Sequence, residues 1–476
     1  MARPGWKCHS QPGRPDARLT SEAPKPRGSR WKNITLATTT ITVLLLLIVV
    51  LQVATQAPPA PTSHGSNLGN KVESTTDWQG LAWGETRKLA VSSNGTLFLG
   101  YRSQERGGVG YKAFVDFSKD SGTTWSHLGG GPISPGTQVQ RVPAIAIGTN
   151  DVLQVVWYEE VSASAGGGDR QIWYSRWVGE NWLTAKIIPY HINGSQQASD
   201  KTHWQEHPDI IVDRFDPMRL YVVWEGTDLT NLANGNCRLT NCDTPMLTVS
   251  TDMGDTWSPY LKLAQPNGES HSRPGIVQDS NGGLHVTWYA NDPGLGARSL
   301  IRYVTSSDRG STWSVETAPI PTTYGSDQRH PSMAADSQGS VHLVWKEKNL
   351  LLSQNQTLYS ELSGGSWSPP VVVHPDQQNQ LSPVVQLDKW GDVYVGWFTG
   401  GPFDWHGDPP SLFDGSQIWL AKFNRTAWSA LQVTTFATNR FVNFPANPMP
   451  ASTVQIVWIE GNSPKPYTIK YSAFVF

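Results

Sequence analysis

An eight-residue frame, Ser-x-Asp-x-Gly-x-Thr-Trp, constrains this chain most, because it occurs three times, beginning at Ser118, Ser250 and Ser306. In such a frame the Asp accepts hydrogen bonds from the amides of the turn, the Gly supplies a positive φ, and the Trp fills the space beside the turn. The frame therefore predicts three equivalent hairpins rather than a catalytic centre. The residues in these structural roles are Asp120, Gly122, Trp125, Asp252, Gly254, Trp257, Asp308, Gly310 and Trp313.

The same period continues beyond the complete copies. Weaker copies of the frame end at Trp182, Trp367 and Trp428. An apolar, strand-like run precedes each frame, and the first of these runs ends in Tyr101. A repeat of roughly 50 to 65 residues fits a four-stranded propeller blade with long loops. The other runs end in Trp157, Trp224, Trp288, Trp345, Trp397 and Trp458.

These repeats predict an all-β protein, a β-propeller with seven four-stranded blades. Six blades is the alternative, if one degenerate repeat is an elaboration. The last repeat lacks its fourth strand, whereas the segment 77–83 precedes the first repeat without a blade of its own. We expect this N-terminal segment to complete the last blade, with Trp78 in the place of the frame's Trp, because such a closure removes an exposed sheet edge.

The N-terminal residues differ in composition from the rest of the chain. Residues 1–33 are rich in Lys and Arg, and residues 34–54 form an uncharged apolar run about long enough to cross a bilayer. We predict a basic cytoplasmic tail (1–33), a transmembrane signal-anchor helix (34–54), a Pro, Ser and Gly-rich stalk (55–74) and an extracellular propeller (75–476). A cleaved signal peptide is the alternative for the apolar run. On this prediction the protein is a single-pass protein of the cell membrane.

Charge and motifs restrict the partners. The net charge of the whole chain is −2, and because the tail is basic, the remainder is acidic. An acidic domain argues against nucleic acid as a partner. The sequence has no phosphate-binding loop between a strand and a helix, no serine nucleophile elbow and no HExxH. We therefore expect no cofactor.

Two cysteines lie close together in the segment NGNCRLTNCD. In an oxidising compartment Cys237 and Cys242 are predicted to form a short disulfide that holds a loop. A metal site would need more ligands than these two thiols, and we predict none.

Topology indicates which face holds a site. Each repeat reads as strand a, an Asp/Gly turn, strand b ending in Trp, a long loop, strand c, the frame and strand d. The a–b turns and the frames then share one face of the propeller, and the long b–c loops and the starts of the strands a share the other. We expect function on that second face, at the mouth of the channel, where loop length and composition concentrate.

Basic residues recur beside the proline that opens strand a. Since strand a is innermost, their side chains are expected to ring the axis. One interpretation is a solvated channel lining. The other is a cationic socket in an acidic domain, in which Arg makes bidentate contacts to a carboxylate. The residues are Arg141, His207, Arg273 and His330, with Glu206 and Arg329 one position earlier, and the next two repeats carry Ser382 and Phe444.

The repeated frame resembles the Asp-box, or bacterial neuraminidase repeat, of the sialidase superfamily, whose members are β-propellers. Arg141-Val142-Pro143 resembles that superfamily's Arg-Ile-Pro motif, although there the motif opens the first blade and here it opens the second repeat. The resemblance implies an arginine triad for the sialic acid carboxylate, a Tyr nucleophile paired with a Glu, and an Asp acid/base. Carried to this chain, it implies Arg141, Arg273 and Arg329 as the triad, Tyr324 as the nucleophile and Glu206 or Glu269 as its partner.

Tryptophans outside the repeat positions are the remaining ligand candidates. Trp204 and Trp405 fall in predicted mouth-face loops, and Trp405 precedes His406 in the segment FDWHGD. A ring, an imidazole and acids together suit a polyol ligand or a metal ion, and an ordinary polar loop is the alternative. We count Trp204, Trp405, His406, His207 and His330 as predicted ligand-binding residues.

The sequence thus predicts a membrane-anchored extracellular propeller that recognises glycans or glycoproteins at its mouth. Hydrolysis of the exo-α-sialidase type is an open question at this level. The alternative of a different class is a non-catalytic adhesion or protein-binding platform, since one fold supports many functions.

Overall fold

The computed structural model describes residues 70–476 except 77–79, 82–85, 105–109, 136–137, 161–169, 189–203, 228–242, 266–269, 293–297, 377, 401–414, 436–437, 451–452 and 462–466. All described residues belong to the unit Pro61–Phe476. The predicted tail and apolar run lie outside the described residues. Within the described part of the chain, no helix is long and apolar enough to cross a membrane.

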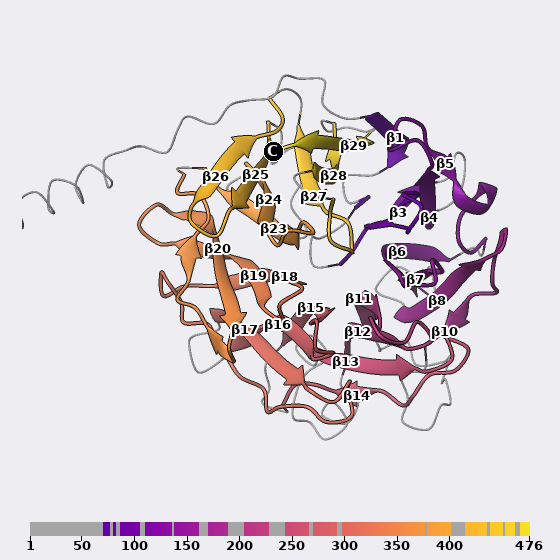
Figure 1. The fold of residues 1–476 in the computed structure, drawn as a ribbon, viewed down its shortest axis with the longest axis horizontal. Helices are drawn as coiled ribbons and strands as arrows, with labels where there is room; N and C mark the ends of the chain where they lie inside the picture. Colours follow the sequence, from indigo (N-terminus) through magenta and orange to yellow (C-terminus); the bar gives the residue numbers. More distant parts are fainter. Residues whose placement is uncertain are drawn as a thin grey trace, which may run out of the picture. The chain divides into compact units, whose positions relative to one another are not determined.

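Each sequence repeat folds into one antiparallel blade, and seven blades surround a common axis (Figure 1). The prediction of seven blades is confirmed. Strands a are β2 (Leu89–Val91), β6 (Val139–Ile147), β11 (Gln205–Val212), β15 (His271–Gln278), β18 (Gln328–Ala335), β23 (Gln380–Leu387) and β27 (Asn439–Asn443). Strands b are β3 (Leu97–Gln104), β7 (Leu153–Glu160), β12 (Leu220–Thr227), β16 (Leu284–Asp292), β19 (Val341–Asn349), β24 (Val393–Thr399) and β28 (Thr453–Glu460).

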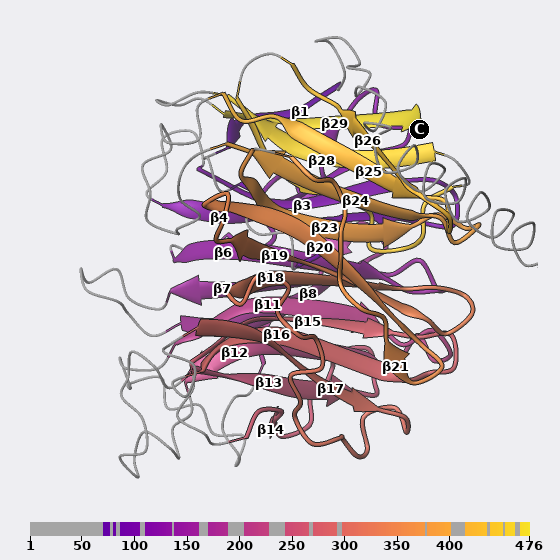
Figure 2. The same ribbon diagram turned by 90° about the vertical axis from the view of Figure 1, so that its left-hand side faces the viewer.

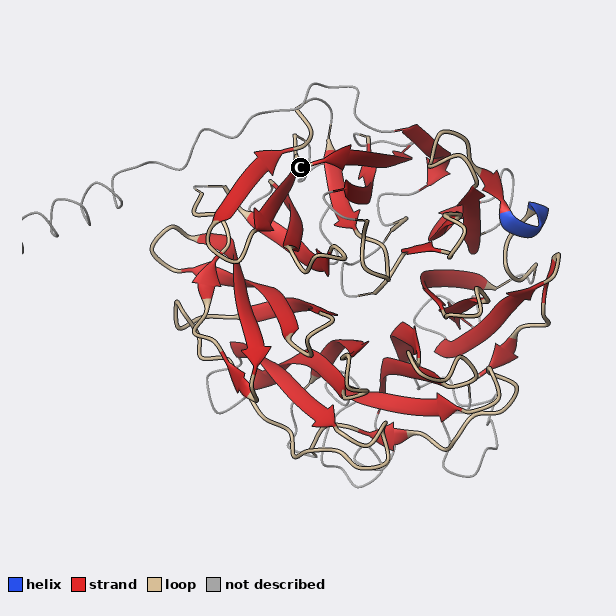
Figure 3. Ribbon diagram, in the orientation of Figure 1, coloured by secondary structure: helices blue, strands red, loops and turns tan. Residues whose placement is uncertain are grey.

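The outer strands are less regular than the inner ones. Strands c are β4 (Tyr111–Ser118), β8 (Arg170–Val178), β13 (Asp243–Ser250), β17 (Arg298–Ser306), β20 (Gln354–Ser363), β25 (Ile418–Phe423) and β29 (Tyr467–Val475). Strands d are β5 (Ser126–His127), β9 (Asn181–Trp182), β10 (Lys186–Ile187), β14 (Leu261–Lys262), β21 (Ser366–Trp367), β22 (Val371–Val372), β26 (Trp428–Gln432) and β1 (Asn70–Thr76). Among the described residues the only helical element is the 3₁₀ turn η1 (Leu128–Gly130), drawn blue in Figure 3.

The tryptophans of strands b lie within these strands, not at their ends as expected from the sequence, and form the core between blades. Trp157, Trp224, Trp288, Trp345, Trp397 and Trp458 are fully buried, and Tyr101 takes the same role in the first blade. Seen edge-on, the strands cross the thickness of the ring, so successive turns alternate between its two faces (Figure 2). This confirms the layout from which the mouth face was predicted.

The three Asp frames form the hairpins expected of them. In the third copy the Asp308 carboxylate accepts hydrogen bonds from the amide (2.8 Å) and the hydroxyl (2.6 Å) of Thr312. The Ser306 hydroxyl donates to Asp308 and accepts from the amide of Gly310. Gly310 has a φ of 88°, and Arg309 before it also has a positive φ, 58°. All of these bonds lie within the frame, which explains why the sequence alone revealed it.

The frame carboxylates make stability depend on pH in the acid range. Hydrogen bonds from Thr312 and Ser306 lower the pKa of Asp308 to about 2. Because the pKa is lowered in the folded state, the stability that this group contributes is present above its unfolded pKa of about 4 and is lost as pH falls toward 2. We expect Asp308→Asn to flatten the decline of the urea unfolding midpoint between those pH values. A decline as steep as that of the unchanged chain would contradict the assignment.

The ring closes through the N-terminal strand, as predicted, but with an earlier segment. Strand β1 pairs with β29 of the last blade, and the Asn70 side chain donates to the carbonyl of Gly122 in the first blade (2.9 Å). β1 ends at Thr76, where the predicted closing segment 77–83 begins, and its first residues fall in the predicted stalk. Its sequence, NKVESTT, is polar and carries no core signal, because the outermost strand of a blade has little to bury. Trp78 lies outside the described residues.

Candidate functional site

A β-bulge recurs near the start of strand a in six blades. The pairing of strands a and b shifts at Arg141/Ala144, Glu206/Asp209, Ser272/Gly275, Arg329/Ser332, Leu381/Val384 and Arg440/Asn443. The bulge residue has a φ between 44° and 57° in every case, a conformation that costs a side-chain-bearing residue roughly 1–3 kcal/mol. These residues are Val142, His207, Arg273, His330, Ser382 and Phe441.

The bulges correct the alignment of repeats made from the sequence. Val142, not Arg141, is equivalent to His207, Arg273 and His330, and Phe441, not Phe444, occupies that place in the last blade. Arg141 instead corresponds to Glu206 and Arg329, one position earlier. The cationic ring at the bulge position is therefore confined to three successive blades.

The residue after the strand-b Trp contacts the bulge residue of the next blade. The ring centroids of Tyr158 and His207 lie 5.9 Å apart, and those of Tyr289 and His330 lie 5.7 Å apart. Between these two pairs, Glu225 accepts a hydrogen bond from the backbone amide of Arg273 (2.5 Å). Farther around the ring the equivalent contact is apolar: the rings of Phe398 and Phe441 lie 5.2 Å apart. The contact between the residue after the strand-b Trp and the bulge residue is therefore polar in some blades and apolar in another.

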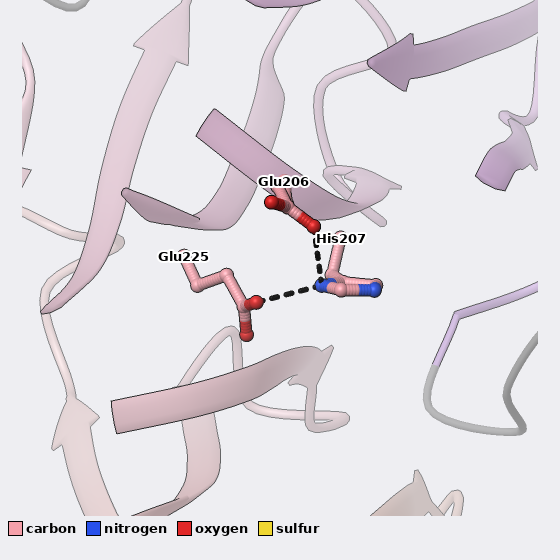
Figure 4. Close-up of side chains that lie close together, drawn as sticks. All are labelled: Glu206, His207 and Glu225. Carbon is pink, nitrogen blue, oxygen red and sulfur yellow. Dashed lines mark hydrogen bonds and ion pairs between the residues drawn. The ribbon is translucent and has the colours of Figure 1, made fainter. Parts of the chain in front are cut away.

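Two glutamates converge on the His207 imidazole (Figure 4). Its Nδ1 lies 2.7 Å from Glu225 Oε1 and 3.8 Å from Glu206 Oε2. Burial opposes ionisation of Glu225, but the neighbouring His207 and Arg273 prevail and lower its pKa. At the start of β13, burial and then the negative charge of Glu225 raise the pKa of Asp243 to about 7. Two carboxyl groups whose pKa values are shifted in opposite directions, Glu225 downward and Asp243 upward, thus lie at one edge of the mouth.

Arginines and aromatic rings alternate beside this cluster. The Arg170 guanidinium lies over Trp204 (4.9 Å) and Tyr158 (5.8 Å) and pairs with Glu206. Arg141 Nε lies 2.9 Å from Glu160. Burial raises the pKa of Tyr158, although Arg141, Arg170 and Arg102 act in the opposite direction.

His330 lies among basic groups. Its side chain is 2% exposed. Burial, followed by the charges of Lys346, Arg273, Arg329 and His207, lowers its pKa well below 6.5. The imidazole is therefore neutral at physiological pH while cationic groups surround it. The structure thus brings the predicted residues His207, Arg273, Arg329 and His330 together.

The predicted nucleophile Tyr324 has a different setting. Its amide donates to Glu347 Oε1 (2.6 Å), and its ring packs against an apolar core cluster that includes Ile320. Burial raises the pKa of Tyr324, with Glu347 acting in the same direction. Tyr158, by contrast, is a tyrosine on which the charges of three guanidinium groups act. The predicted residues Glu269, Trp405, His406, Cys237 and Cys242 lie outside the described residues and stay predictions.

The opposite end of the channel holds a cavity of about 440 Å³ lined by residues from all seven blades. Arg87 lines it and reaches across the channel to Asp209 (2.6 Å). Asp213 is paired with Arg309, and Asn447 bonds both backbone groups of Val91. These polar groups have partners within the protein, as do those of the mouth. We place the candidate site at the mouth because arginine, histidine and carboxylate side chains gather there.

Comparisons agree with this architecture. A polysaccharide lyase, an ulvan lyase, is similar over 85% of this chain and 94% of its own, with a TM-score of 0.53 and 10% identity. The Trypanosoma rangeli sialidase in complex with sialic acid is similar over 86% of this chain and 59% of its own, with a TM-score of 0.47 and 13% identity. A Ruminococcus gnavus intramolecular trans-sialidase is similar over 87% of this chain and 99% of its own, with a TM-score of 0.42 and 12% identity. No family model and no curated sequence matches the chain. At such identities the likeness is one of fold.

Sequence reasoning missed the residues that follow the strand-b tryptophans. Tyr158, Glu225, Tyr289 and Lys346 each come directly after such a Trp, so their position in the repeat was readable. Their contacts were not, because each contact crosses to the next blade. Arg170 and Asp243 open strands c after loops of irregular length, and no repeat signal marks them.

Proposed function

We propose that this protein is a membrane-anchored, extracellular propeller that binds acidic glycans at its mouth. The observation that carries the proposal is the group of Arg273, Arg329, Lys346 and His207 around the neutral His330. A buried guanidinium binds a carboxylate strongly because water does not compete. Trp204, which is partly exposed, adds an aromatic ring on which a sugar can stack.

The location is part of the proposal. It rests on the apolar run 34–54 and the basic residues before it, which follow the positive-inside rule. On this view the mouth meets glycans outside the cell.

Hydrolysis of α-sialosides is the finer activity to test. The Tyr158 phenol lies under the influence of Arg102, Arg141 and Arg170, and Asp243 has a pKa of about 7, suited to proton donation at neutral pH. We expect the full-length chain in detergent to release fluorophore from a fluorogenic α-sialoside between about pH 4 and 8. The activity is lost in Arg141→Ala and Arg273→Ala.

Binding is measured beside turnover. Retention of the chain on sialylated but not desialylated glycans, without fluorophore release, would support recognition and overturn hydrolysis. A folded chain that retains no acidic glycan would overturn the proposed function and favour the protein-binding platform.

The Tyr289 and His330 pair favours a second activity, elimination on a uronate-containing polysaccharide. In that reaction neutral His330 removes the proton beside the carboxylate, Arg273 neutralises the carboxylate, and the bond to the leaving oxygen breaks as Tyr289 donates a proton, leaving a carbon–carbon double bond. We expect ultraviolet absorbance to rise with a uronate polysaccharide as substrate. The absorbance should not rise with His330→Asn or with a carboxyl-reduced polysaccharide. A rise in either case would overturn the proposed elimination activity.

A further inference from the structure

We propose that Glu206, His207 and Glu225 form a binding site for a divalent transition-metal ion of the Zn²⁺ class. The ligand atoms are Glu206 Oε2, His207 Nδ1 and Glu225 Oε1. One atom from each residue lies within 4.8 Å of the others. This inference does not rest on the glycan proposal.

The three side chains point inward from two neighbouring strands. Glu206 and His207 are consecutive on β11, and the bulge there directs the His207 side chain toward Glu225 on β12 (Figure 4). The side chains are 12%, 12% and 13% exposed, which leaves a path for an ion from solvent.

The outward oxygen of each carboxylate is already held by another group. Glu206 Oε1 pairs with Arg170, and Glu225 Oε2 accepts the Arg273 amide at 2.5 Å. Each inward oxygen is thereby oriented toward Nδ1. Ligands of metal ions in proteins are oriented in this way by surrounding hydrogen bonds.

A proton on His207 cannot bind both carboxylates of this cluster. The single proton on His207 Nδ1 is donated to Glu225 Oε1 at 2.7 Å, and Glu206 Oε2, at 3.8 Å, lies beyond hydrogen-bond distance. A divalent ion can bind all three atoms at once, because metal–ligand distances of about 2.0–2.2 Å place tetrahedral ligand atoms about 3.3–3.6 Å apart. The 2.7 Å separation of His207 Nδ1 and Glu225 Oε1 would widen and the 3.8 Å separation of His207 Nδ1 and Glu206 Oε2 would narrow, each by less than about 1 Å. Binding replaces the imidazole proton, which is released to solvent.

The donor set indicates the kind of ion. An imidazole with two carboxylates suits Zn²⁺ or Mn²⁺, whereas Ca²⁺ and Mg²⁺ prefer oxygen ligands throughout. The two carboxylates balance the charge of the ion among the neighbouring arginines. Three protein ligands leave a coordination position open to an oxygen of a bound ligand.

The test is calorimetric titration of the full-length, tag-free chain in detergent with Zn²⁺, after treatment with a chelator. We expect one Zn²⁺ per chain, Ca²⁺ binding at least tenfold weaker, and Zn²⁺ affinity that falls as pH is lowered. Glu206→Gln and Glu225→Gln should each weaken Zn²⁺ binding by about tenfold or more. Far-ultraviolet circular dichroism checks that each variant is folded.

Two controls separate this site from others. Glu460→Gln changes a carboxylate at the corresponding end of strand b in the last blade, where it pairs with Lys470, outside the cluster. A triple Cys8→Ser, Cys237→Ser, Cys242→Ser variant removes all three thiols of the chain. Both variants should bind Zn²⁺ as the unchanged chain does. If the glutamate variants fail to fold, the Co²⁺ spectrum of the unchanged chain decides, because these ligands give no thiolate charge-transfer band. A thiolate band, no Zn²⁺ binding, or equal affinity in folded glutamate variants would overturn the inference. Zn²⁺ binding without glycan binding would uphold it and overturn only the proposed function.

Discussion

Replacing Gly122 by Ala is expected to lower the free energy of unfolding by about 2–5 kcal/mol. Gly122 has a φ of 86°, and an added Cβ would overlap the ring of Tyr471 in the last blade. The left-handed backbone costs an L-residue about 1–2 kcal/mol, and displacing the ring adds about 1–3 kcal/mol. Because Tyr471 also packs against Trp125 and lies in the strand that pairs with β1, the substitution loosens the closure of the ring. Urea unfolding followed by tryptophan fluorescence measures the effect.

The same frame supplies a matched control. At Gly310, with a φ of 88°, the nearest atoms to an added Cβ are Leu284 Cδ1 at 3.4 Å and Tyr221 Cε1 at 3.5 Å, ordinary contact distances. Gly310→Ala should therefore show only the backbone cost of about 1–2 kcal/mol. Equal losses at Gly122 and Gly310 would contradict the assigned role of Tyr471.

Replacing Arg273 by Ala is expected to weaken binding of an acidic glycan by about 2–5 kcal/mol, on the order of 30-fold or more. The Arg273 side chain is 2% exposed, and its backbone amide still satisfies Glu225 in the variant, so the local hydrogen bond survives. Affinity is measured by calorimetry with a sialylated or uronate oligosaccharide. Arg273→Lys should recover only part of the affinity, since an ammonium group cannot reproduce the bidentate contact.

A control arginine lies at the other end of the channel. Arg214 is exposed and lines the opposite cavity, so Arg214→Ala should leave glycan affinity unchanged. Equal losses for the two substitutions would show that binding responds to net charge rather than to the mouth.

Much of the fold was predictable because its signals are local. The Asp frame closes its hydrogen bonds within a few residues, and a strand-b Trp recurs at one place in six of the seven repeats, with Tyr101 there in the first. Closure by the N-terminus was inferred from a missing strand. The segment was placed too late in the chain, because β1 is polar and Trp78 favoured the segment 77–83.

The candidate site was predictable only as a region. Basic residues next to the prolines marked the mouth, and the structure does bring His207, Arg273, Arg329 and His330 together there. The alignment of the repeats was wrong at Arg141, because the bulge position was not visible in the sequence. The bulge residue has a positive φ, and here it is Val, His, Arg, Ser or Phe, residue types that do not usually indicate that conformation. Tyr324 was chosen from a loop and stays a prediction, whereas no motif pointed to Tyr158, on which the charges of Arg141, Arg170 and Arg102 act.

The sequence by itself determined the number of blades and the order of their strands, since both follow from signals that repeat along the chain, and it indicated the face on which we place the candidate site. Only the tertiary structure decided which side chains meet. The contacts of Tyr158 with His207, of Glu225 with Arg273 and of Tyr289 with His330 each join residues about 40 to 50 positions apart on neighbouring blades. Such contacts depend on how one blade packs against the next, and no local sequence pattern predicts that packing.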